Sequence, residues 1–198
     1  MIKDGLVLTH GAGGDSRSSL LVAVARAFEQ AGVLVQLYDL PFRQKRATGG
    51  PHPSGAAADR DGLRQAAAEM RKRVSGRVFL GGQSYGGRQA SILAAEDSTV
   101  VDGLLLLSYP LHPPGKPEQL RTAHFPALRT PCVFVQGTRD PFGSVEELRQ
   151  AIPLIDAPVA HVIVDDAGHD LKRGMFDATP AIRALLGFRI YDLDILKP

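Results

Sequence analysis

The sequence predicts an α/β domain: a doubly wound, mostly parallel sheet of six strands with helices on both faces. Two observations support this class, namely short apolar runs of strand length and the longer helical segments that alternate with them. The expected strands are residues 6–9, 33–38, 77–81, 101–107, 131–136 and 160–164. Because strands and helices alternate along the chain, the strands should run parallel and be joined by right-handed crossovers.

Capping and turn signals locate the helices. Asp15 or Ser16 can cap a first helix that reaches about residue 31 and ends at Gly32. Further helices are expected at residues 56–74, 86–96, 145–152 and 179–186. Two stretches should be irregular: residues 43–54 form a long polar loop, and residues 109–117 contain four prolines, which prevent regular structure.

Composition narrows the class of protein. A chain of 198 residues with 44% hydrophobic content suits one domain, residues 1–198. A net charge of +2 without a long Lys/Arg run gives no support for a nucleic-acid partner. We find neither a signal peptide nor a membrane-spanning run of about 18 apolar residues. The single cysteine, Cys132, cannot form an internal disulfide, so we expect a cytoplasmic protein with no membrane partner.

The most informative segment is residues 78–87, VFLGGQSYGG, in which Ser84 lies between Gly82 and Gly86. An apolar strand leads into the segment, and RQASILAA, a run of good helix formers, follows it. A serine on a sharp turn from strand to helix has a strained backbone, and larger side chains two residues away would collide there. The G-x-S-x-G spacing therefore predicts a nucleophilic serine on such a turn.

An acidic residue and a histidine follow two other expected strands. Asp140 comes just after the fifth expected strand and His169 just after the sixth. In a parallel sheet the carboxyl ends of the strands share one edge, so these side chains can meet Ser84 there. The chain order serine, aspartate, histidine is that of an α/β-hydrolase triad. We therefore predict a catalytic triad of Ser84, His169 and Asp140.

The chain resembles a small α/β-hydrolase without a lid. The stretches THGAGGD, GGQSYGGR, SYPLHPPGKPEQLR and FVQGTRDPFG are similar to the branch of testis-expressed protein 30 and subunit 3 of the NSL chromatin complex. More distantly, the chain resembles dienelactone hydrolases. The likeness spans nearly the whole chain and implies a reduced hydrolase fold, without the two amino-terminal strands of a full eight-stranded hydrolase and without a cap domain.

Each expected site residue has a chemical role. His169 would take the proton of Ser84 as the base and later return it as the acid, while Asp140 would hold the imidazole. An oxyanion hole needs two donors, and the fold supplies one from the backbone N–H of Tyr85. The second should come from residues 10–14 (HGAGG), the glycine-rich loop after the first strand. The donor there is expected to be the N–H of Ala12 or alternatively that of Gly13.

Other acids and histidines have weaker claims. Asp165 or Asp166 could serve as the acid, but both lie on the same strand end as His169. His10 should order the oxyanion loop rather than act as a second base. The remaining histidines share no ligand spacing, so we expect neither a metal nor a cofactor.

Four residues are candidate substrate contacts. Arg43 and Arg46, in the long polar loop, could line the mouth of the site and favour an anionic substrate, or could form a solvated basic loop. Tyr109 and Phe142 could form part of an apolar wall. We expect a small ester or other acyl compound in an open site. The oligomeric state stays undetermined, although residues 188–198 could add an edge strand or meet a partner.

Two other functions fit parts of the sequence. In the first, VLTHGAGGDS and Asp39 resemble a dinucleotide-binding turn with its ribose-binding acid, but Ser16 stands where the third glycine belongs. In the second, the chain is a binding or scaffold protein that keeps the hydrolase fold without turnover. An intact triad argues against a pure scaffold.

Overall fold

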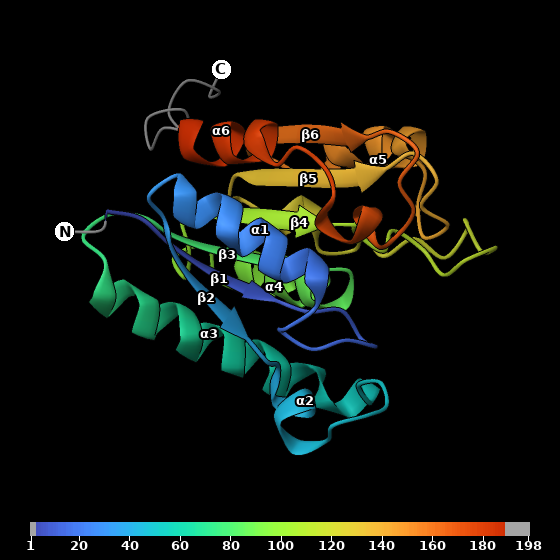
Figure 1. Ribbon diagram of the computed structural model, residues 1–198. Coiled ribbons are helices and arrows are strands. Elements are labelled where there is room, and N and C mark those ends of the chain that lie inside the picture. Colours follow the sequence, from blue (N-terminus) through green and yellow to red (C-terminus); the bar gives the residue numbers. More distant parts are fainter. Residues whose placement is uncertain (1–2, 189–198) are drawn as a thin grey trace.

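The computed structural model describes residues 3–188, and in these residues six strands form a single sheet (Figure 1). The strands are β1 (Gly5–Thr9), β2 (Leu34–Tyr38), β3 (Val78–Gln83), β4 (Gly103–Leu107), β5 (Cys132–Gly137) and β6 (Val159–Val164). Their spatial order is β2-β1-β3-β4-β5-β6, and each neighbouring pair is parallel. The predicted six-stranded α/β fold is confirmed, with a described sheet that is parallel throughout.

Helices cover both faces of this sheet. The α-helices are α1 (Ser19–Gln30), α2 (Pro41–Lys45), α3 (Ala56–Arg73), α4 (Tyr85–Glu96), α5 (Val145–Ala151) and α6 (Thr179–Gly187). Short 3₁₀ turns are η1 (Pro53–Gly55), η2 (Phe125–Ala127), η3 (Ile152–Leu154) and η4 (Leu171–Gly174). Helices α1 and α6 pack on one face, and α3, α4 and α5 pack on the other (Figure 1).

The core therefore has two apolar layers, one on each face of the sheet. Alternate residues of a strand point to opposite faces, so Leu104 and Leu106 join the layer under α3 and α4, whereas Leu105 and Leu107 join the layer under α1 and α6. All four leucines are buried. This double burial explains why the central strands read as continuous apolar runs.

Two local predictions need correction. Ser18, rather than Asp15 or Ser16, caps α1, since its side chain accepts a hydrogen bond from the N–H of Leu21. The expected irregular loop at residues 43–54 overlaps α2, because Pro41 has the backbone angle for a first helical position and Phe42 is buried in the core.

Two further features concern membranes and the end of the chain. None of the helices formed by residues 3–188 is both long and apolar enough to span a bilayer. The expected edge strand or interface at the end of the chain falls on residues 189–198, which lie outside the described residues.

Residues 108–131 link β4 to β5. This long connection contains no α-helix and packs on α4. The hydroxyl of Tyr109 donates to the carbonyl oxygen of Arg121 at 2.8 Å, and the N–H of Arg121 donates to the carbonyl oxygen of Leu111 at 2.7 Å. Further along, the ring of His124 is hydrogen-bonded through Nε2 to Ser91 of α4 at 2.8 Å. The first two bonds hold the connection in its own shape, and the bond between His124 and Ser91 fixes it against α4.

His124 should make the stability of the fold depend on pH. Burial, with the positive charge of Arg88, lowers the pKa of His124 from 6.5 to about 4. The unfolded chain therefore binds a proton near pH 6.5 that the folded chain refuses until about pH 4, so the free energy of unfolding falls as the pH drops through this window. Urea denaturation at pH 7.5 and pH 5 should show a smaller loss for His124→Gln than for the native protein. Equal losses would contradict this assignment.

Candidate active site

Ser84 lies on a strained turn between β3 and α4. Its backbone angles are φ +50° and ψ −115°, a region that residues other than glycine rarely adopt. The N–H of Ser84 donates to the carbonyl oxygen of Leu107 at the end of β4, at 2.8 Å. The turn thus exposes the serine at the carboxyl edge of the sheet, as the sequence motif predicts.

The glycines around Ser84 allow this turn because no side chain would fit. A Cβ atom on Gly82 would lie 2.6 Å from the backbone nitrogen of Gly87. A Cβ atom on Gly86 would lie 2.5 Å from the carbonyl oxygen of His10 and 2.6 Å from a methyl group of Thr9. The helix therefore packs directly against the end of β1, where the glycine-rich loop begins.

Ser84, His169 and Asp140 form a continuous chain of hydrogen bonds. The Oγ atom of Ser84 lies 2.8 Å from Nε2 of His169, and Nδ1 of His169 lies 2.9 Å from both carboxylate oxygens of Asp140. The side chain of Asp140 is fully buried, whereas that of His169 is 23% exposed. A carboxylate at Nδ1 keeps the proton on that nitrogen and leaves Nε2 free to accept the serine proton.

Neighbouring groups hold the two partners of Ser84 in place. The N–H of Phe142 donates to Asp140 at 2.9 Å, and the ring of Phe142 stacks on that of His169 with 4.1 Å between centroids. The side-chain amide of Gln83 donates to the carbonyl oxygen of His169 at 3.1 Å. The alternative acid Asp166 instead pairs with Arg139 at the surface, at 2.7 Å. The hydrogen-bonded acid is therefore Asp140.

A cavity of about 520 Å³ opens beside Ser84. Its walls combine the glycine-rich loop, the turn at Ser84, and side chains from the carboxyl ends of other strands. The lining residues are Gly11, Ala12, Gly13, Gly14, Gln83, Ser84, Tyr85, Arg88, Pro110, Arg121, Phe142 and His169. Among the described residues, the N–H groups of Ala12, Gly13 and Tyr85 have no hydrogen-bond acceptor, so both alternatives for the second oxyanion donor stay open.

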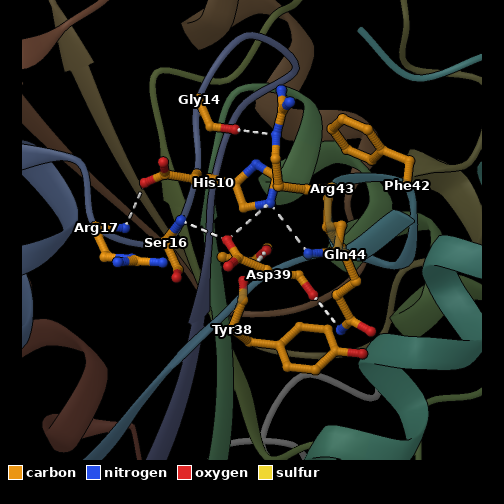
Figure 2. A network of polar contacts seen from close by, with 12 residues as sticks. His10, Gly14, Ser16, Arg17, Tyr38, Asp39, Phe42, Arg43 and Gln44 are labelled. Carbon is orange, nitrogen blue, oxygen red and sulfur yellow. Dashed lines mark hydrogen bonds and ion pairs between the residues drawn. The ribbon is translucent and has the colours of Figure 1, made fainter. Parts of the chain in front are cut away.

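The side chains of His10 and Arg43 contact the backbone of the glycine-rich loop (Figure 2). Nδ1 of His10 lies 2.8 Å from the carbonyl oxygen of Gly11, and its Nε2 accepts from the N–H of Leu40 at 3.1 Å. Burial lowers the pKa of His10, which keeps the ring neutral and able to accept that bond. His10 thus contacts the loop backbone, and the sequence predicted this ordering role.

Arg43 is buried and directed at backbone carbonyls rather than at the cavity. Its guanidinium donates to the carbonyl oxygens of Gly14 at 2.8 Å, Ala12 at 3.3 Å, Gly49 at 2.9 Å and Arg46 at 3.1 Å. Four such bonds tie the glycine-rich loop to the segment after α2. The expected substrate contact of Arg43 is therefore replaced by a structural one.

The other expected substrate contacts divide between the cavity and the core. Phe142 lines the cavity, as expected. Tyr109 is only 1% exposed and packs against Phe125 and Phe134, so it belongs to the core because the connection after β4 folds inward. Arg46 lies in a separate hollow beside α2 and donates to the carbonyl oxygen of Gly50 at 3.0 Å.

Sequence reasoning missed three charged residues near Ser84. Asp59 of α3 is 1% exposed and accepts hydrogen bonds from the hydroxyl of Tyr85 at 2.8 Å and from the N–H of Phe42 at 3.1 Å. Arg88 and Arg121 line the cavity itself. Arg88 stands one helical turn after Ser84, a spacing visible in GGQSYGGR, whereas nothing in the sequence singles out Arg121.

The fold and this arrangement of side chains define the class of protein. The chain belongs to the alpha/beta hydrolases: a family model described as an alpha/beta hydrolase domain matches residues 3–179.

Solved structures agree with this family. An alpha-beta serine hydrolase homologue from Coxiella burnetii superposes with a TM-score of 0.69 and 18% identity over 88% of this chain and 81% of that one. Dienelactone hydrolase from Anabaena variabilis has a TM-score of 0.69 and 18% identity over 94% and 87%. A serine hydrolase without a lid from Xanthomonas campestris has a TM-score of 0.68 and 18% identity over 91% and 79%. At such identities the likeness concerns the fold.

Replacing a glycine beside Ser84 should destabilise the protein. We expect Gly86→Ala to lower the free energy of unfolding by about 1–3 kcal/mol, because the new methyl group overlaps the backbone of His10. Gly55→Ala is the matched control, since a Cβ atom there meets nothing within 4 Å. Urea denaturation of both variants checks this expectation. Equal stabilities would show that β1 yields to the extra methyl group.

Arg43→Lys should loosen the glycine-rich loop. A lysine ammonium cannot reproduce the planar fork that reaches four carbonyl oxygens, so we expect a loss on the order of 2 kcal/mol in the free energy of unfolding. Faster proteolysis near residues 10–14 and 46–50 should accompany it. The control is Arg46→Lys, which alters one exposed bond to Gly50. A native cleavage pattern in Arg43→Lys would refute the role of Arg43.

Proposed function

We propose that this protein is a serine hydrolase of the carboxylesterase type that forms an acyl-enzyme on Ser84. The observation that carries the proposal is the hydrogen-bonded chain from Ser84 through His169 to Asp140, with distances of 2.8 and 2.9 Å. Because a free hydroxyl is a poor nucleophile, a base within hydrogen-bond reach is the main requirement for attack on an acyl carbon. The same three residues line up at the strand ends in the order expected of a hydrolase.

In the first half-reaction, Oγ of Ser84 attacks the acyl carbon while its proton passes to Nε2 of His169. The carbonyl oxygen becomes an oxyanion, for which the backbone N–H groups of Tyr85 and Ala12 are the proposed donors. The bond between the acyl carbon and the alcohol oxygen then breaks. The leaving alcohol takes the proton from His169, and the acyl group stays on Ser84 as an ester.

The second half-reaction repeats these steps with water. His169 removes a proton from a water molecule, and the resulting hydroxide attacks the acyl-enzyme. Collapse of the second oxyanion breaks the bond to Ser84, which recovers its proton from His169. The acid product leaves. Asp140 stabilises the cationic imidazole in both half-reactions because its buried carboxylate accepts from Nδ1.

The proposed substrate is a small ester, with a thioester or an amide as the less favoured bond. Support comes from the cavity beside Ser84, where the catalytic histidine keeps part of its surface exposed. The narrower branch we propose is that of testis-expressed protein 30 and subunit 3 of the NSL complex, on the sequence stretches quoted above. A dinucleotide-binding function is less well supported, since Asp39 already accepts the N–H of Ser16 at 2.7 Å.

Covalent labelling tests the nucleophile directly. A fluorophosphonate probe should label the native protein, and Ser84→Ala should abolish the label, because the probe reacts with a serine activated by a base. Ester hydrolysis should fall by at least about 10⁴-fold in Ser84→Ala and His169→Ala, and somewhat less in Asp140→Asn. Intact-protein mass spectrometry and initial rates give the two readouts.

The control for labelling is Ser98→Ala, which changes an exposed serine after α4 and should react as the native protein does. A native protein that stays unlabelled while correctly folded would overturn the hydrolase proposal. Such a result would favour a binding or scaffold protein with a retained hydrolase fold.

A further inference from the structure

Two arginines share the cavity with Ser84. Arg88 and Arg121 line its wall together with Pro110, whereas the glycine-rich loop forms another part of the lining. These parts come from opposite sides of the turn, since β3 lies between β1, which leads into the loop, and β4, which leads into the connection that carries Arg121. An acyl group on Ser84 would therefore have backbone amides on one side and guanidinium groups on the other.

Arg88 lies one helical turn after Ser84, at the start of α4. The N–H of Arg88 donates to the carbonyl oxygen of Ser84 at 2.9 Å, which places the two residues one helical turn apart. Side chains of a helix tilt toward its amino terminus, so the side chain of Arg88 leans back toward the serine. This relation is built into the local backbone and does not depend on a loop.

The Nε atom of Arg88 is unpaired among residues 3–188. It is also shielded from solvent. By contrast, the side chain of Arg60, which faces the same helix, pairs with Glu96 at 3.1 Å and with Gln89 at 3.0 Å. A buried polar group without a partner calls for an explanation, and an anion that binds at the site is a chemical one.

Arg121 adds a second positive charge that is also nearly free. Its side chain makes one long contact within the described residues, to the carbonyl oxygen of Pro110 at 3.4 Å, and no ion pair. Burial, followed by the charge of Arg88, lowers the pKa of Arg121, although an arginine stays protonated at any ordinary pH. Its backbone is fixed at both ends of the residue by Tyr109 and Leu111, so the side chain starts from a rigid position.

Within the described part of the chain, no carboxylate in the cavity lining balances these charges. The lining that residues 3–188 form holds no Asp or Glu, and the nearby Asp140 is already bonded to His169 and Phe142. Two like charges in a partly buried site repel each other, and an anion between them would remove that repulsion. Planar guanidinium groups match a carboxylate with paired hydrogen bonds.

From this arrangement we infer that Arg88 and Arg121 form a subsite for a carboxylate carried by the acyl part of the substrate. The inference rests on the proposed hydrolase function, which it narrows to half-esters of dicarboxylic acids. We assign the carboxylate to the acyl part of the substrate because the acyl group stays on Ser84 through both half-reactions. Arg88 lies one helical turn after Ser84, so its contact with that group can persist in both. The sequence analysis considered Arg43 and Arg46 as contacts for an anionic substrate. The proposed subsite assigns this contact to Arg88 and Arg121 instead.

The test compares two methyl esters of similar shape. In monomethyl glutarate a carboxylate ends the acyl chain, and in methyl 5-methylhexanoate an uncharged isopropyl group replaces it. We expect the native protein to favour the glutarate ester by about tenfold or more in kcat/KM, and Arg88→Met and Arg121→Met each to reduce that ratio by about tenfold. The exposed Arg149→Met removes one charge elsewhere and should leave the ratio unchanged.

Binding is measured separately from turnover. Calorimetric titration of the native protein should detect glutarate, the acid product, and should detect no binding of its neutral diamide. Arg88→Lys and Arg121→Lys keep the charge and should retain part of the binding, which guards against a variant that fails to fold.

The two proposals can fail independently. Glutarate binding that needs Arg88, in a protein that a fluorophosphonate does not label, would support the subsite and contradict the hydrolase proposal. Labelling of Ser84 without glutarate binding and with equal use of both esters would overturn the subsite alone. An unchanged ester ratio in Arg88→Met would also overturn it.

Discussion

The strained turn at Ser84 is the constraint on which the rest of the site depends. A left-handed φ at a serine persists only where the surroundings fix it, and here the close approach of α4 to β1 does so. A Cβ atom on Gly86 would overlap the backbone of His10, so the same close packing that holds Ser84 also sets the start of the glycine-rich loop. Ser84 and the candidate oxyanion donors are consequently fixed relative to each other.

The parallel sheet supplies the remaining alignment. Neighbouring strands β3, β4, β5 and β6 end at one edge, and the loops after β5 and β6 bring Asp140 and His169 to Ser84. The two loops are tied together, since the N–H of Arg139 donates to the carbonyl oxygen of Ala167 at 2.9 Å. Rigid strands and short tied loops together keep three side chains within hydrogen-bond distance.

The arginines near this edge of the sheet have different contacts. Arg43 satisfies backbone carbonyls behind the glycine-rich loop, so its charge serves the shape of the loop. Arg88 and Arg121 line the cavity; among residues 3–188, Nε of Arg88 has no hydrogen-bond partner, and the side chain of Arg121 makes one long contact, to the carbonyl oxygen of Pro110 at 3.4 Å. Arginines that look alike in the sequence thus have different roles, and only their contacts distinguish them. The positive charges of Arg88 and Arg121 are the basis for the proposed carboxylate on the substrate.

The sequence by itself determined the fold class, the turn at Ser84 and the order of Ser84, Asp140 and His169, because periodicity, glycine spacing and strand ends are local signals. Tertiary structure decided what depends on distant partners. Arg43 and Tyr109 proved to be structural, since carbonyls and aromatic rings far along the chain surround them. Arg121 entered the cavity because its connection folds back over α4. A residue's type shows which contacts it can make, and only the folded chain decides which atoms reach it.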